Sequence, residues 1–347
     1  MIDRTYCMSS YLMFRSTADP EKAFYSKQSP QLVDLSFERR PVTNSDELIA
    51  ALRAEVEKAT QDGKAALALS GGIDSAILAK LMPPSSTAYT FKCVVPGVDV
   101  TDETHAAARY AEECGLKHEI IPIYWDDIVK EAPILMRHKG APIHSIEAQV
   151  SKAAKKAGKD GFTKLIFGEN ADIIYGGMDG LISKDWLFGE FVDRYTYVKP
   201  YHVLKEPMMI LEPFFEFMED GHIDGHSFIN KYFRQEALGT YTNACSANHI
   251  AFIGPYSKTV MGVPIDYARI RSGDTKYLVR EAFKKLYPDF NVTPKIPMPR
   301  PMNEWMQNWD GPKRPEFIPH CTDNMSGDQK WMVFALEMFL NMIDEGE

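Results

Sequence analysis

In the first half of the chain, continuous apolar runs typical of buried strands alternate with segments whose apolar residues have helical spacing. Residues 65–69 form an unbroken apolar run, which predicts a strand that is buried on both faces. Upstream of this run, Leu48 and Leu52 stand on one face of a predicted helix, and the capping-box spacing of Asn44 and Glu47 indicates that the helix begins near Asn44. A glycine turn follows the strand, and after it Ile77, Leu78 and Leu81 predict a helix.

The same alternation continues as far as residue 168. Further strands are expected over residues 87–95, 118–123 and 164–168, and further helices over residues 103–115 and 143–158. Because strands alternate with helices, the sequence predicts an α/β fold with a parallel, doubly wound sheet. We expect this α/β domain to span residues 44–200, after an N-terminal segment of residues 1–43. The apolar spacing of residues 201–347 predicts a mainly helical part that packs on it.

Composition narrows the class of protein. The chain has 347 residues, 45% of them hydrophobic, and a net charge of −9, which argues against a broad nucleic-acid-binding face. No apolar run has the length that a membrane-spanning helix needs. Five widely spaced cysteines without a CxxC pair do not predict a disulfide framework or a zinc ribbon. We therefore expect a soluble, cytoplasmic protein with neither nucleic acid nor a membrane as partner.

The sequence SGGIDS, at residues 70–75, stands where the buried strand turns into a helix. Ligands bind at this position in open α/β sheets. Gly71 and Gly72 allow the backbone to approach a phosphate closely, and the helix start offers unpaired N–H groups. Ser70 and Ser75 can add hydroxyl donors, and Asp74 can bind Mg²⁺. The loop has no lysine after its glycines, so it is not a Walker loop.

A second group of polar residues follows the strand predicted over residues 164–168. Glu169 and Asp172 are carboxylates three positions apart, and at the carboxyl end of a parallel strand they can face one cleft. Gly168 precedes them and is assigned to the nucleotide-binding residues. The alternative interpretation is a helix N-terminus with solvated acidic residues.

Both segments resemble those of known ATP-dependent enzymes. SGGIDS resembles the pyrophosphate loop of the ATP-pyrophosphatase superfamily, which includes asparagine, GMP and NAD synthetases. GENADIIYGG is similar to the Gly-Glu-Gly-Ala/Ser-Asp-Glu-aromatic-Gly-Gly segment of asparagine synthetases. The resemblance implies ATP and Mg²⁺ as cofactors, with Asp74 and Asp172 on the metal and Glu169 accepting a proton from the nitrogen nucleophile. Two departures, Asn170 for a glycine and Ile173 for the second glutamate, change the wall of the pocket.

A third segment is NVTPKIPMP, residues 291–299, which follows LVREAFKKLYP. This order resembles the synthetase family's helix and the lysine-bearing segment after it. By this resemblance Lys295 contacts the polyphosphate and neutralises charge on departing pyrophosphate. Arg280 could assist it. A solvated surface lysine and a helix-surface ion pair are the alternatives.

Residues 9–26 resemble the connector between the glutaminase and synthetase domains of glutamine-dependent asparagine synthetases. In that family a catalytic cysteine follows the start methionine, but here Ile2 takes that place. The resemblance therefore implies a synthetase domain without its glutaminase. Ammonia or an amine would then be the nitrogen donor, and a separate glutaminase or amidohydrolase chain could supply it.

The expected activity is an ATP-dependent ligase that adenylates a small-molecule carboxylate, releases pyrophosphate and forms an amide. Two alternatives remain at the level of sequence. One is an enzyme like NAD synthetase, whose loop closely resembles SGGIDSA, and the other is a non-catalytic, nucleotide-binding paralogue with a regulatory or scaffolding role. The sequence leaves the acceptor, the amine and the oligomeric state open.

Overall fold

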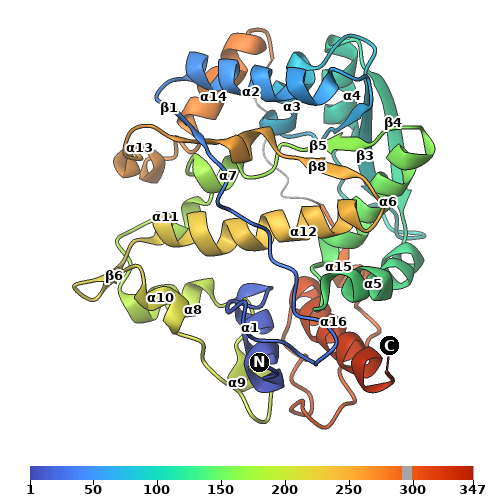
Figure 1. The fold of residues 1–347 in the computed structure, drawn as a ribbon, viewed down its shortest axis with the longest axis vertical. Helices are drawn as coiled ribbons and strands as arrows, with labels where there is room; N and C mark the ends of the chain where they lie inside the picture. Colours follow the sequence, from blue (N-terminus) through green and yellow to red (C-terminus); the bar gives the residue numbers. More distant parts are fainter. Residues whose placement is uncertain (291–298, 347) are drawn as a thin grey trace.

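A parallel five-stranded sheet lies at the centre of the computed structural model, which describes residues 1–290 and 299–346 (Figure 1). Its strand order is β4-β3-β2-β5-β8. The strands are β2 (Ala65–Ala68), β3 (Thr87–Cys93), β4 (Lys117–Ile123), β5 (Lys164–Ile166) and β8 (Ala251–Ile253). The α/β fold class and the four strands predicted from apolar runs are confirmed. β8 comes from beyond residue 200, where the apolar spacing predicted mainly helices.

Helices cover both faces of this sheet, as a doubly wound fold requires. On one face, α2 (Ser45–Thr60), α3 (Ile73–Leu81) and α14 (Tyr277–Leu286) contact one another. On the other, α5 (Trp125–Lys139), α6 (Ser145–Lys159) and α12 (Arg234–Ser246) form a second layer. Figure 1 shows α2 and α14 above the sheet and α12 below it. The predicted start of α2 is confirmed, because the Asn44 side chain accepts hydrogen bonds from the backbone N–H groups of Asp46 and Glu47.

The remaining elements surround these layers. The helices among them are α1 (Arg4–Phe14), α4 (Thr104–Glu113), α7 (Ala171–Ile174), α8 (Phe188–Tyr195), α9 (Pro200–Val203), α10 (Glu212–Phe215), α11 (Gly225–Phe228), α13 (Tyr267–Arg271), α15 (Met302–Trp305) and α16 (Gly327–Asp344). The other strands are β1 (Arg40–Val42), β6 (Met218–Glu219), β7 (His222–Ile223) and β9 (Thr259–Met261). β1 pairs in parallel with β9, so the N-terminal segment is tied to a late part of the chain.

Both ends of the described chain contribute to the core below α12. The hydroxyl of Tyr11 in α1 and the indole N–H of Trp331 in α16 donate hydrogen bonds to the same backbone carbonyl, that of Ile143, at 2.8 and 3.0 Å. Tyr11 and Trp331 are each 1% exposed. α1 and α16 are therefore integral to the fold and hold the chain that leads into α6.

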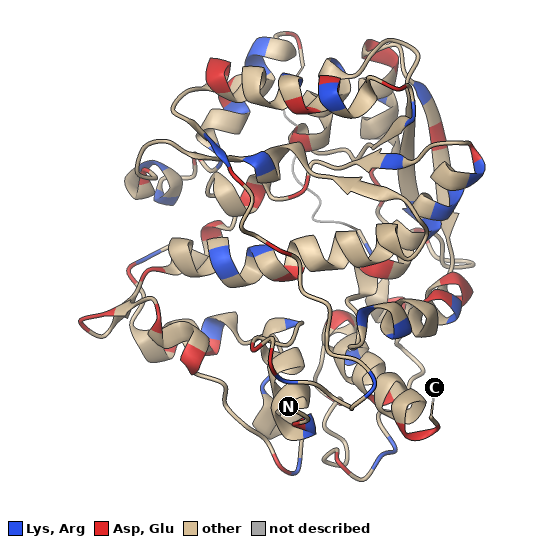
Figure 2. Cartoon of the chain, in the orientation of Figure 1, with Lys and Arg blue, Asp and Glu red and all other residues tan. Residues whose placement is uncertain are grey.

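Acidic and basic residues are interspersed on the helices at the top of the molecule (Figure 2). None of the helices within residues 1–290 and 299–346 combines the length and the apolar character needed to cross a membrane.

Candidate active site

The loop from Ser70 to Ser75 lies at the carboxyl end of β2 and turns directly into α3. The backbone N–H of Ser70 donates to Ser75 Oγ at 3.0 Å, and the two hydroxyl oxygens are 2.9 Å apart. The N–H of Gly72 donates to Ser70 Oγ at 3.2 Å. Gly72 is the N-cap of α3 and provides no side-chain cap. The serines therefore hold the loop in shape, and the helix start presents backbone N–H groups suited to an anion.

Two glycines permit the close packing around this loop. A Cβ atom on Gly71 would lie 3.0 Å from Ala106 Cβ. A Cβ on Gly168, at the end of β5, would lie 2.9 Å from the backbone nitrogen of Ser75. The structure thus brings the SGGIDS and GENADII segments into contact, as expected from adjacent parallel strands. That these residues bind a nucleotide stays a prediction.

A buried lysine forms ion pairs with Asp74 and Asp172, the two aspartates that the family resemblance assigns to Mg²⁺. Lys276 Nζ lies 2.8 and 2.7 Å from the two carboxylate oxygens of Asp74, and 3.0 Å from Asp172 Oδ1. Lys276 is 5% exposed. Burial lowers the pKa of this ammonium group, but the charges of the two aspartates outweigh burial, so its pKa is raised. The group therefore remains positive beside the SGGIDS loop.

Lys276 was not singled out from the sequence. It is the N-cap of α14 and has a left-handed backbone, with φ of 51°. The sequence feature that could have identified Lys276 is its position shortly before the LVREAF helix, which carries Arg280. Arg280 donates to the backbone carbonyl of Thr275 at 2.7 Å, so it orients the turn that holds Lys276. Lys295, the lysine that the resemblance favoured, lies outside the described residues.

The chain after α7 passes so close to this cluster that only glycine fits. A Cβ on Gly177 would lie 2.1 Å from Asp172 Oδ1 and 2.7 Å from Lys276 Cδ. The N–H of Gly177 donates to the backbone carbonyl of Asp172 at 2.7 Å. The backbone of Gly177 therefore lies directly against the charged cluster formed by Asp74, Asp172 and Lys276.

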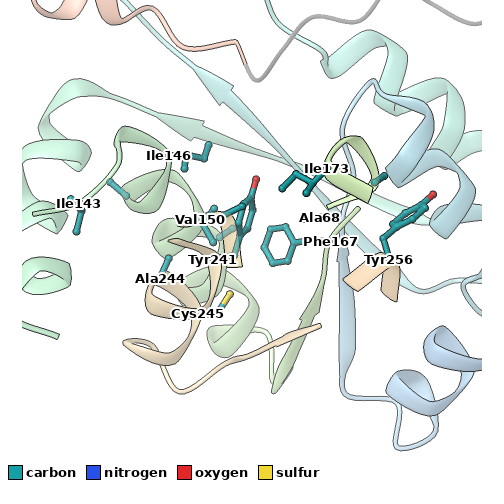
Figure 3. Packing of buried hydrophobic residues seen from close by; sticks show 14 of the residues in the cluster. Ala68, Ile143, Ile146, Val150, Phe167, Ile173, Tyr241, Ala244, Cys245 and Tyr256 are labelled. Atoms are coloured by element: carbon teal, nitrogen blue, oxygen red, sulfur yellow. The ribbon is translucent and has the colours of Figure 1, made fainter. Parts of the chain in front are cut away.

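The two departures from the family pattern have structural reasons. Asn170 adopts a left-handed backbone, with φ of 73°, a region that glycine enters freely and asparagine tolerates better than most residues. Its side chain donates to Ser257 Oγ at 2.7 Å. Ile173 is 2% exposed, and Figure 3 shows it among the buried apolar side chains near Phe167. An ionised glutamate in such a place would pay a desolvation penalty.

Glu169 lies between β5 and α7, and its surroundings favour the neutral carboxyl. Burial, the largest influence, raises its pKa from 4.5 to about 7. Hydrogen bonds from the hydroxyl of Tyr241 and the N–H of Asn170 oppose this rise, while the negative charges of Asp172 and Glu236 add to it. A carboxyl with a pKa near neutrality suits a general base.

Tyr241, in α12, is a site residue that sequence analysis missed. Its ring packs edge-on against Phe167, with centroids 5.0 Å apart (Figure 3). The ring is thereby fixed while the hydroxyl holds Glu169. No local pattern distinguishes this tyrosine from the other aromatic residues of the chain, because its role depends on α12 lying across the end of β5.

The donor set around Asp74 and Asp172 can be tested for Mg²⁺. Their carboxylate oxygens are the hard ligands that Mg²⁺ prefers, and sites for this ion typically use one or two carboxylates plus substrate phosphates and water. Among the residues that the structure describes, no group of three or more His, Cys, Asp and Glu could hold a metal alone. The pair fits a site that is completed by a phosphate-bearing substrate.

An open cavity of about 640 Å³ borders the charged cluster at Gly177. Residues 177–181 form one wall, and residues 194–197 at the end of α8 form another. The remaining lining residues are Arg15, Phe233, Ser326 and Gln329. Gly177 is thus common to the cavity lining and to the surroundings of Asp172 and Lys276, neither of which lines the cavity.

Comparisons with known proteins give one family match. The model of the asparagine synthase family matches residues 47–240, which is more than half of the chain. Among solved structures, NMN synthetase from Francisella tularensis is similar at 11% identity and a TM-score of 0.29, over 74% of this chain and 100% of that chain. The U34-tRNA thiolase NcsA from Methanococcus maripaludis is similar at 15% identity and a TM-score of 0.26, over 73% of this chain and 84% of that chain. No curated protein matches the sequence.

Proposed function

Because the chain belongs to the asparagine synthase family, we propose that it is an AMP-forming ligase that adenylates a carboxylate and transfers ammonia or an amine to it. Family membership itself supports ATP binding and ligase activity. The observation that carries the finer proposal is the grouping of Asp74, Asp172, Lys276 and Glu169 around the SGGIDS loop.

In the first half-reaction, an acceptor carboxylate oxygen attacks the α-phosphorus of ATP. The bond to the bridging oxygen breaks, and pyrophosphate leaves with the electron pair. The N–H groups at the start of α3 bind phosphate oxygens, and the ammonium of Lys276 neutralises charge that develops on them. Asp74 and Asp172 would hold Mg²⁺, which when bound neutralises further phosphate charge. Lys295 is proposed to contact the same polyphosphate.

In the second half-reaction, ammonia or an amine attacks the acyl carbon and AMP departs with the electrons of the broken acyl–oxygen bond. Glu169 accepts the proton that the nitrogen loses. Tyr241 keeps the carboxylate of Glu169 oriented through its hydroxyl. Ammonia from solution serves this step, and a separate glutaminase or amidohydrolase chain is proposed as its source in the cell.

The products of nucleotide turnover test the proposal. Incubation with ATP, Mg²⁺, ammonium and candidate acids should give AMP and pyrophosphate, resolved by chromatography, only when an acceptor is present. Asp74→Asn should abolish this turnover, whereas Glu57→Gln, a change on the exposed face of α2, should not. ADP as the main product of the unaltered chain would refute the proposal.

A further inference from the structure

A second open cavity, of about 440 Å³, borders α7 at Ile174, the last residue of that helix. Most of its lining is apolar, and its polar side chains are those of Arg39, His226, Ser227 and Asn230. Apolar walls with a few polar groups, in a volume of roughly 300–1,000 Å³, are typical of small-molecule sites. The lining shares no residue with the candidate active site, so the cavity is a separate feature of the molecule.

Arg39 gives this cavity its positive charge. The influences on its pKa are burial, which lowers it, and Tyr175, which raises it, so no carboxylate is among them. The Nη1 atom is buried without a hydrogen-bond partner in the described chain. Nε and Nη2 also lack a partner among the described residues, but they are not buried, so a ligand can reach them. The described part of the chain thus provides no counter-ion for Arg39, and it places no acidic residue in the cavity lining.

A second arginine without a counter-ion lies close to Arg39. Arg234, the first residue of α12, is 4% exposed, and its Nε and Nη2 atoms are buried without partners within residues 1–290 and 299–346. Burial and the like charge of Arg39 lower its pKa to about 10, so both groups are positive at neutral pH. Arg234 does not line the cavity. It therefore contributes its charge to the cavity rather than hydrogen-bond donors.

A third cation belongs to the same neighbourhood. The guanidinium carbon of Arg234 lies 5.5 Å from the ring centroid of Phe37, and Lys258 Nζ lies 3.7 Å from the same centroid. A cleft that carries charge of one sign between apolar walls concentrates ions of the opposite sign. The cavity at Arg39 is therefore suited to an anion.

The backbone beside the cavity also has a rare geometry. α11 continues into α12 through a π-helical turn, η2 (Ile229–Phe233), and such turns occur frequently at functional sites. The turn contains the lining residue Asn230, and Arg234 follows it directly. His226, one turn earlier, has its Nε2 atom 3.3 Å from the backbone carbonyl oxygen of Ile174. One irregular helix thus supplies cavity residues and also contacts the end of α7.

From the unpaired arginine and the shape of this cavity, we infer a second small-molecule site, which binds an oxyanion and is distinct from the candidate active site. Arg39 donates hydrogen bonds to the oxyanion, and the charge of Arg234 strengthens the attraction. The apolar lining covers the rest of the molecule. Arginine recognises phosphates and carboxylates alike through paired donors, so the shared chemistry is a phosphate or carboxylate group.

Calorimetric titration of the full chain tests this site. The probes are inorganic phosphate and malonate in low-chloride buffer, and the one that binds more tightly identifies the kind of oxyanion. Arg39→Gln should weaken its binding roughly 10- to 100-fold, as for loss of hydrogen bonds to a charged group. Arg39→Lys keeps the charge but not the paired donors and should bind with intermediate affinity. Arg40→Gln, an exposed neighbour in β1 that does not line the cavity, should bind as the unaltered chain does.

The titration is repeated with saturating Mg²⁺ and α,β-methylene-ATP, an analogue that cannot be cleaved at the α-phosphorus. Binding that depends on Arg39 should persist, because the analogue and the probe occupy different places. Loss of all probe binding in the presence of the analogue would place the oxyanion at the SGGIDS loop and refute a second site. No binding of either probe, or equal binding by Arg39→Gln and the unaltered chain, would refute it as well.

Thermal unfolding separates a binding arginine from a structural one. In anion-free buffer Arg39→Gln should melt no lower than the unaltered chain, because the change removes a charge that repels Arg234. The tighter-binding probe should raise the melting temperature of the unaltered chain and of Arg40→Gln, but not that of Arg39→Gln. A lower melting temperature of Arg39→Gln without any anion, together with equal probe stabilisation in all three proteins, would show that Arg39 serves only the fold.

Discussion

Replacing Glu169 by glutamine should make the protein more stable than the unaltered chain at alkaline pH. Burial raises the pKa of Glu169 from 4.5 to about 7, so the folded state binds this proton more tightly than the unfolded state does. Stability must therefore fall as pH rises between these two values and stay low above the upper one. Glutamine does not ionise, so the stability of Glu169→Gln should not decrease with pH for this reason.

The size of the effect follows from the shift. The difference between the two pKa values is 7 − 4.5, and each pKa unit corresponds to about 1.36 kcal/mol. The full difference is thus about 3 kcal/mol, of which about 2–3 kcal/mol develops between about pH 5 and about pH 8. Urea unfolding at a series of pH values would measure it as the free energy of unfolding of Glu169→Gln minus that of the unaltered chain.

Glu57→Gln is the matched control, because Glu57 is exposed on α2 and its variant should show no such pH-dependent gain. Tyr241→Phe removes a hydrogen bond that lowers the pKa of Glu169 in the folded state, so the upper end of the pH window should move to higher pH while its lower end stays in place. Parallel stability curves for Glu169→Gln and the unaltered chain would refute the reasoning. Glu169 would then ionise like an exposed glutamate, and its assignment as a base poised near neutrality would lose its physical support.

Three further predictions concern Lys276, Gly177 and Asn170, which lie in or next to the candidate active site. Lys276→Met should lower single-turnover pyrophosphate release roughly 10²- to 10³-fold, because one preorganised charge contact is lost; an unchanged rate would exclude Lys276 from the chemistry. Gly177→Ala should abolish activity and lower the melting temperature through its clash with Asp172, whereas Gly189→Ala, which has open space, should do neither. Asn170→Gly should keep its stability in urea unfolding within about 1 kcal/mol, whereas Asn170→Ala should lose about 1–2 kcal/mol, because alanine is strained at this left-handed position.

Much of the sheet was predictable because burial on both faces requires continuous apolar runs. β2 shows this directly, since it is buried at each of its four positions. β8 escaped prediction because it has only three residues, none of them fully buried. β8 joins the sheet through backbone hydrogen bonds with β5. Such bonds do not require a particular pattern of apolar side chains, so the sequence does not reveal them.

The sequence by itself located the SGGIDS turn between β2 and α3 and the acidic residues that follow β5, and it indicated the family, because these features lie in short contiguous segments. The resemblance assigned Asp74 and Asp172 to one metal ion, and in the structure their proximity follows from the pairing of β2 with β5, the strands that precede them. Only the tertiary structure decided which side chains complete the site. Lys276 and Tyr241 reach it from α14 and α12, and their roles arise from burial and opposite charge among residues far apart in the chain. Such interactions depend on distance and on exclusion of water, neither of which is encoded in local spacing.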